Sequence, residues 1–115
     1  FRFYRDVMSF EVHQGQEEGV YAEFKSGGIL LAIYPRTMMA EVAGTTDLPH
    51  GAAIQDPVCL TFEVDDVDAF AQQVQNAGVP LVAPPTDREV WFLRTAHFRD
   101  PAGNPIEINA PLKPS

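Results

Sequence analysis

The part of this chain with the clearest capacity for chemistry is residues 97–109, near the C-terminus. Its middle contains Asp, Pro, Gly and Asn, which favour a tight turn between two strands. After the turn, apolar Ile106 and Ile108 alternate with polar Glu107 and Asn109, so one face of the second strand is polar. A carboxylate in mid-strand is costly unless it faces water, a partner or a ligand. Glu107 is therefore a candidate site residue.

His97 lies at the start of the same stretch. If the turn pairs Phe98 with Ile106, His97 faces Glu107 across the two strands. A His–Glu pair can act as a general base or bind a polar ligand, so both residues are candidates for catalysis and for ligand binding. A shift of one residue would send His97 to the apolar face as a structural histidine, and Glu107 can equally be an inert, hydrogen-bonded carboxylate.

The second half of the sequence predicts the element order strand, helix, strand, strand, strand. These elements cover residues 58–64, 67–77, 79–83, 89–99 and 105–110, with a loop at 84–87. Asp65 or Asp66 can cap the helix, and Gly78 can end it. The buried stripe of the helix is expected to contain Val67, Phe70, Val74 and Ala77.

The first half predicts helix, strand, strand, strand and then a short helix, over residues 1–8, 9–13, 21–25, 29–34 and 36–42. A two-residue turn at 27–28 places Glu23 opposite Ala32 and Tyr21 opposite Tyr34. The other face of this hairpin is apolar and should pack on a helix. Tyr21, Glu23 and Tyr34 are candidate ligand-binding residues, because aromatic rings beside an acid suit a flat or cationic ligand. The alternative is that these side chains take part only in ordinary core or interface packing.

Two further strands contribute candidates by alternation alone. Thr61 and Glu63 share one face of the strand at 58–64 with Cys59, which we expect to be a small buried hydrophobic residue rather than a metal ligand. Trp91 shares the face of His97 if no bulge intervenes. Thr61 and Trp91 are therefore predicted to contact a ligand, whereas His13, where the strand at 9–13 meets a turn, is assigned no role.

Composition excludes several classes of function. The 115 residues carry a net charge of -8, which disfavours nucleic acid, and no apolar run approaches the ~20 residues of a membrane span. Cys59 is the only cysteine, which excludes an intrachain disulfide and fits a cytoplasmic protein. Because Phe1 already lies in an expected helix, we expect the natural N-terminus, including one strand, to precede it.

Three motifs carry a resemblance to a known family. They are Phe3-Tyr4-Arg5-Asp6-Val7-Met8-Ser9-Phe10, Phe62-Glu63-Val64-Asp65-Asp66-Val67 and Asp100-Pro101-Ala102-Gly103-Asn104-Pro105-Ile106-Glu107. With the order of elements, they resemble the vicinal oxygen chelate superfamily of glyoxalases, bleomycin-resistance proteins and extradiol dioxygenases. The resemblance implies an α+β fold: two βαβββ modules whose mixed sheet curls around a cleft, with helices outside, in a homodimer. The modules would be residues 1–44, lacking their first strand, and 58–115, joined by a linker at 45–57 within one domain.

The resemblance also implies where relatives that use a metal hold it. The matching positions present in this chain are Ala32, Cys59 and Glu107. Only Glu107 keeps the usual type of ligand, because Ala32 has no donor atom and a thiolate suits softer metals than Mg, Mn or Fe. We therefore expect no complete metal site and no cofactor, although Glu107 can contribute to a divalent metal site.

Three functions follow as expectations. The first is the binding, in the cleft, of a small organic molecule of cationic or aromatic character. The alternative is a metal-dependent lyase, isomerase or dioxygenase of the glyoxalase type, in which the metal acts as a Lewis acid. The second alternative is a non-catalytic structural dimer. The fold alone does not distinguish among these three functions, since one scaffold supports unrelated chemistries.

Overall fold

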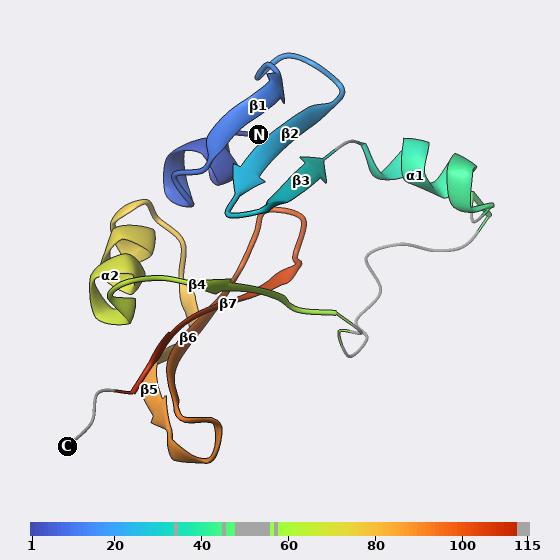
Figure 1. The fold of residues 1–115 in the computed structure, drawn as a ribbon. Helices are drawn as coiled ribbons and strands as arrows, with labels where there is room; N and C mark the ends of the chain where they lie inside the picture. Colours follow the sequence, from blue (N-terminus) through green and yellow to red (C-terminus); the bar gives the residue numbers. More distant parts are fainter. Residues whose placement is uncertain (34, 45, 48–55, 57, 113–115) are drawn as a thin grey trace. The chain divides into compact units, whose positions relative to one another are not determined.

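The computed structural model describes residues 1–33, 35–44, 46–47, 56 and 58–112 (Figure 1). The chain divides into two compact units, residues 1–54 and 55–115, each of which is described by itself. Among the described residues, no helix is long and apolar enough to cross a membrane.

The first unit contains a three-stranded antiparallel sheet in the order β1-β2-β3. Its elements are η1 (Phe3–Val7), β1 (Glu11–Gly15), β2 (Ala22–Ser26), β3 (Ile29–Ile33) and α1 (Arg36–Ala43). The helix predicted at residues 1–8 is present, with Arg2 and Met8 at its ends, but its residues Phe3–Val7 are π-helical. The Met8 amide donates to the carbonyl of Phe3, at 3.0 Å, and this wide turn lets Phe3, Tyr4 and Met8 be buried together.

The β2–β3 hairpin has the register predicted from its turn, with Glu23 opposite Ala32. Its apolar face is buried at Ala22 and Phe24, and the Phe24 ring lies 5.9 Å from that of Tyr4 in η1. The prediction that this face packs on a helix is therefore confirmed. Tyr34 lies outside the described residues, so its pairing with Tyr21 stays a prediction. The short helix α1 ends as predicted at Gly44, in the left-handed conformation with φ 73°.

The second unit is a complete βαβββ module, as predicted (Figure 1). Its elements are β4 (Leu60–Glu63), α2 (Val67–Asn76), β5 (Leu81–Arg88), η2 (Glu89–Trp91), β6 (Leu93–Arg99) and β7 (Pro105–Pro111). They form a four-stranded sheet in the order β4-β7-β6-β5. The sheet is mixed, because β4 runs parallel to β7 while the other pairs are antiparallel. The fold is thus α+β, and the curling of both sheets around a cleft stays a prediction.

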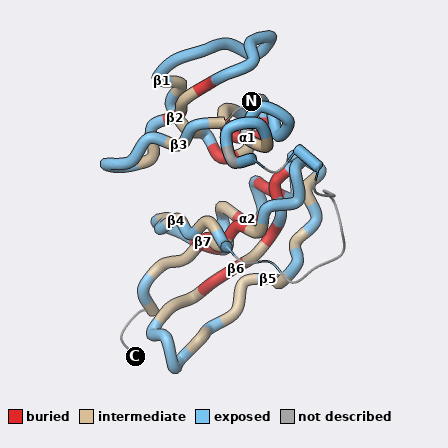
Figure 2. The backbone as a smooth tube through the Cα atoms, turned by 90° about the vertical axis from the view of Figure 1, so that its right-hand side faces the viewer, coloured by how far each residue is buried: buried red, intermediate tan, exposed pale blue. Residues whose placement is uncertain are grey.

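Helix α2 packs on one face of this sheet and builds the core of the second unit. The Asp66 side chain caps it by accepting a hydrogen bond of 3.0 Å from the Ala69 amide. The buried apolar residues come from α2, β6 and β7, and buried positions are red in Figure 2: Val67, Ala71, Val74, Ala96, Phe98, Ile106 and Ile108. Val67 and Val74 are thus buried as predicted, but Phe70 is only half-buried, and Ala71 takes the place of Ala77, which caps the end of the helix and is exposed.

The loop predicted at residues 84–87 is wrong, because β5 continues to Arg88. Two irregularities in register, at 81–83 and 83–86, each insert one extra residue opposite β6. Both prolines lie in the second bulge, on a strand at the edge of the sheet. There their missing N–H groups cost no ladder hydrogen bond, so the strand tolerates a sequence typical of a loop.

The strand predicted from residue 89 begins only at Leu93. Glu89–Trp91 form a 3₁₀ turn, and Phe92 follows in the left-handed conformation with φ 58°. The Phe92 carbonyl accepts a hydrogen bond of 3.0 Å from the Leu112 amide, which ties this turn to the end of β7.

Candidate functional site

The face of the four-stranded sheet opposite α2 carries three of the predicted site residues, Thr61, His97 and Glu107. We call it the polar face and define it by Thr61, Glu63, Thr95, His97, Glu107 and Asn109. Alternation along β6 and β7 produces it, since Ala96, Phe98, Ile106 and Ile108 are buried on the α2 side.

His97 and Glu107 meet on this face in the predicted register. The His97 Nε2 lies 3.0 Å from the Glu107 Oε1, and the other oxygen, Oε2, accepts a hydrogen bond of 2.8 Å from the Asn109 side-chain amide. The two side chains are only 25% and 15% exposed. The Glu107 carboxylate is therefore fixed from both sides and itself fixes the imidazole ring.

The turn between β6 and β7 sets this register. The Asp100 Oδ1 accepts hydrogen bonds from the amides of Ala102 and Asn104, at 3.0 and 2.8 Å, while Oδ2 accepts one from the Asn104 side chain. Gly103 supplies the positive φ of 89° that the turn requires. The structure thus explains why a sequence rich in Asp, Gly and Asn places His97 opposite Glu107.

The strand β4 adds Thr61 in register with Glu107. Cys59 precedes this strand and is exposed, so the expectation of a buried cysteine is wrong. The reason is that β4 begins two residues later than predicted, at Leu60, which leaves Cys59 outside the ladder. Partial desolvation of the thiol and the negative charge of Glu107 raise the pKa of Cys59. A thiol has to lose its proton to bind a metal, and a raised pKa makes that loss less favourable.

Trp91 is not placed on the polar face by alternation, because it belongs to η2 rather than to β6. It is 56% exposed, and the Arg88 guanidinium lies 5.8 Å from the centre of its ring. The Arg88 Nε donates to the Thr95 Oγ1, at 3.4 Å. Arg88 thus links the indole ring to the polar face, although the sequence analysis did not single it out.

The first unit holds a second polar cluster. The Tyr21 hydroxyl donates a hydrogen bond of 2.6 Å to the Glu23 Oε2, and the His13 Nε2 lies 3.8 Å from the Glu23 Oε1. The sequence analysis missed His13, because a β-bulge between Val12 and Gln14 brings it beside Glu23. Nothing in the local sequence marks that bulge.

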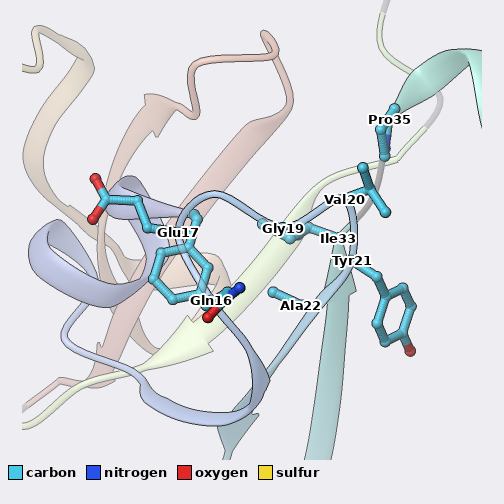
Figure 3. A pocket seen from close by; sticks show the side chains of 9 residues that line it. Gln16, Glu17, Gly19, Val20, Tyr21, Ala22, Ile33 and Pro35 are labelled. Carbon is cyan, nitrogen blue, oxygen red and sulfur yellow. The ribbon is translucent and has the colours of Figure 1, made fainter.

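Each unit also contains a cavity lined by described residues. One, of about 240 Å³ in the first unit, is lined by Gln16, Glu17, Val20, Tyr21, Ile33 and Pro35, among others. In Figure 3 the Tyr21 ring points away from the Gln16 and Glu17 side chains. The other, of about 490 Å³ in the second unit, lies at the start of α2 and contains Asp68 and Arg94. Neither of these two cavities is lined by His97 or Glu107.

The polar face does not supply the ligands of a catalytic metal site. Such sites commonly use three protein ligands, and the described residues contain no group of three His, Cys, Asp or Glu side chains that could hold a metal ion. His97 and Glu107 are two donors that already bond to each other. Ala32 has no donor atom, and it pairs with Glu23 in the first unit. Within the described residues of the second unit, His97 and Glu107 therefore do not by themselves make a three-ligand site.

Comparisons with known proteins agree on one family. A model of the Glyoxalase/Bleomycin resistance protein/Dioxygenase superfamily matches residues 1–108. The uncharacterized protein YraH of Bacillus subtilis (strain 168) is 35% identical over 106 residues, which cover 92% of this chain and 83% of that protein.

Solved structures show the same fold. A glyoxalase/bleomycin resistance protein/dioxygenase family enzyme from Burkholderia phytofirmans PsJN has a TM-score of 0.76 at 20% identity, covering 96% of this chain and 86% of that chain. A lactoylglutathione lyase from Agrobacterium tumefaciens has a TM-score of 0.67 at 26% identity, covering 94% of this chain and 80% of that chain.

Proposed function

Because the chain belongs to the glyoxalase/bleomycin resistance protein/dioxygenase superfamily, we propose that it binds a small organic molecule on the polar face. His97 and Glu107 are the polar anchor for that molecule. The observation that carries the proposal is the 3.0 Å contact between these two half-buried side chains. Small-molecule sites typically use a few precisely placed polar groups to fix the orientation of the ligand.

The contact also defines what the anchor can do. When Glu107 is ionised, the His97 Nε2 carries the proton that it donates to Oε1, so the second ring nitrogen presents a lone pair. Among the described residues, no hydrogen-bond partner occupies that second nitrogen. It can accept a hydrogen bond from a hydroxyl or amine of the ligand, and Glu107 would stabilise the imidazolium if a proton were transferred.

The main competing function is a metal-dependent lyase, which the similarity to the Agrobacterium lactoylglutathione lyase favours. The donor set described above argues against it, since His97 and Glu107 alone do not make a three-ligand site. We therefore place binding first and derive no reaction step through a metal.

One experiment separates these functions. Untagged protein is screened by NMR against small aromatic compounds that are cationic, neutral or anionic, and its metal content is measured by elemental mass spectrometry. We expect at least one compound to shift the amide signals of β6 and β7 saturably. His97→Ala and Glu107→Gln should weaken this binding about tenfold or more, the usual cost of losing a hydrogen bond to a charged group.

The matched control is Asp65→Asn, which removes one carboxylate at an exposed position between β4 and α2, outside the polar face. It should bind with unchanged affinity. If neither His97→Ala nor Glu107→Gln alters binding, the anchor is refuted. About one equivalent of bound metal, lost in Glu107→Gln and retained in Asp65→Asn, would favour the lyase instead.

A further inference from the structure

Arg88 differs from the other arginines of the second unit in its partners. Arg94 forms hydrogen bonds to Asp68 and Asp87, and Arg99 forms two to Asp56. Among the residues that the structure describes, no carboxylate lies within ion-pair distance of the Arg88 guanidinium. This holds in a chain with 16 acidic and 8 basic side chains, where a carboxylate partner is easy to find.

The Arg88 guanidinium is nevertheless held in place. It lies against the Trp91 ring, 5.8 Å from the ring centre, and its Nε donates to the fully buried Thr95 hydroxyl, at 3.4 Å. The indole and the hydroxyl together fix the guanidinium plane. The terminal N–H groups, which form the fork that matches a carboxylate, are not used by these two contacts.

Arg88 also has a defined place relative to the anchor. Thr95 lies two residues before His97 on β6, and both belong to the polar face. Two residues of an extended strand span about 7 Å. A small molecule on this face can therefore reach the Arg88 guanidinium with one end and the His97–Glu107 pair with the other.

From these contacts we propose that Arg88 binds a carboxylate of the ligand, so the ligand is a small organic acid with a hydroxyl or amine at its opposite end. This inference rests on the proposed function, because His97 and Glu107 hold that opposite end. It replaces the expectation of a cationic ligand. The Glu107 carboxylate is already engaged by His97 and Asn109, whereas the charge of Arg88 meets no carboxylate among the described residues.

The test uses the single tryptophan of the chain, whose indole N–H gives one peak in a ¹H–¹⁵N spectrum. The protein is titrated with acetate, benzoate and para-hydroxybenzoate. Two analogues replace the carboxylate of para-hydroxybenzoate: para-hydroxybenzamide is the uncharged analogue, and para-hydroxybenzylamine is the cationic analogue. The variants are Arg88→Gln, Arg88→Lys and Glu107→Gln. Arg2→Gln is the control, since it makes the same change in net charge at a 78% exposed side chain in the other unit.

We expect saturable binding of para-hydroxybenzoate, weakened about tenfold or more by Arg88→Gln and unchanged by Arg2→Gln. Arg88→Lys should bind more weakly than the natural protein, because an ammonium keeps the charge without the fork. The uncharged analogue para-hydroxybenzamide should bind weakly, and with the same affinity, to the natural protein and to Arg88→Gln. The remainder of each spectrum shows whether the variant is folded.

Any of three results would overturn the inference. The first is equal affinity of Arg88→Gln and the natural protein for para-hydroxybenzoate, and the second is no saturable binding of any carboxylate. The third is tighter binding of para-hydroxybenzylamine, the cationic analogue, than of para-hydroxybenzoate. The two proposals fail separately. Loss of affinity in Glu107→Gln but not in Arg88→Gln would retain the anchor and refute the carboxylate contact. Loss in Arg88→Gln but not in Glu107→Gln would refute the anchor and support the carboxylate contact.

Discussion

Replacing Asp100 by alanine tests how firmly the β6–β7 turn holds the candidate site. Asp100 is 7% exposed, and its carboxylate accepts three hydrogen bonds, two from backbone amides and one from the Asn104 side chain. Hydrogen bonds to a charged group are worth about 1.5–3 kcal/mol each. Ala102 and Asn104 are exposed, so water can satisfy part of what the variant leaves unpaired.

The expected loss in the free energy of unfolding is therefore about 2–4 kcal/mol for Asp100→Ala, less than the full sum of the three bonds. Asp100→Asn keeps an oxygen for both backbone amides and should lose about 1 kcal/mol. The control is Asp65→Ala, at an exposed position, which should change stability by less than about 0.5 kcal/mol.

Urea unfolding followed by Trp91 fluorescence measures these values, because the only tryptophan lies in the second unit. A second readout concerns the site: the proximity of His97 to Glu107, measured by cross-strand nuclear Overhauser effects, should weaken in Asp100→Ala. The reasoning would be refuted if Asp100→Ala behaved like Asp65→Ala in both measurements.

Three further predictions concern the frame of the second unit. Asp66→Ala removes the cap of α2 and should cost about 1 kcal/mol in urea unfolding, and a value matching Asp65→Ala would contradict the role of the cap. Ile108→Ala should cost about 2–5 kcal/mol but leave ligand affinity unchanged, because Ile108 is buried on the α2 side; a parallel loss of affinity in folded protein would disprove the separation of the two faces. The hydrogen bonds from Arg94 lower the pKa of Asp68, so this pair stabilises the protein above the ordinary Asp pKa of about 3.9, and the contribution disappears as pH falls through the lowered value. Arg94→Gln should therefore have a lower urea midpoint than the natural protein at neutral pH, and the difference between the two midpoints should shrink as the pH falls. If the difference stayed the same at low pH, the ion pair would not be the cause of the destabilisation.

The pairing of His97 with Glu107 could be predicted because two local signals agree. Turn residues between the strands allow few registers, and the isoleucines on either side of Glu107 fix which face is apolar. The same logic placed Glu23 opposite Ala32. In both hairpins the loop is short, so local chemistry determines the partner across the strands.

The errors share a different physical cause. Alternation placed Trp91 wrongly, because a 3₁₀ turn interrupts the strand there. Bulges also account for the loop wrongly predicted in β5 and for the contact of His13 with Glu23 that the sequence analysis missed. Such interruptions depend on contacts with a neighbouring strand rather than on the local sequence. Arg88 was missed for the same reason, since its contacts with Thr95 and Trp91 exist only after η2 has folded the chain back.

The prolines in β5 also affect how this protein behaves when concentrated. An exposed edge strand offers unpaired amides on which a strand of another molecule can grow, and β5 forms one edge of the four-stranded sheet. Pro84 and Pro85 have no amide hydrogen to offer, and the two bulges twist the edge away from the flat geometry that a new strand would need. The same irregularity that made β5 look like a loop in the sequence thus protects this edge from edge-to-edge aggregation.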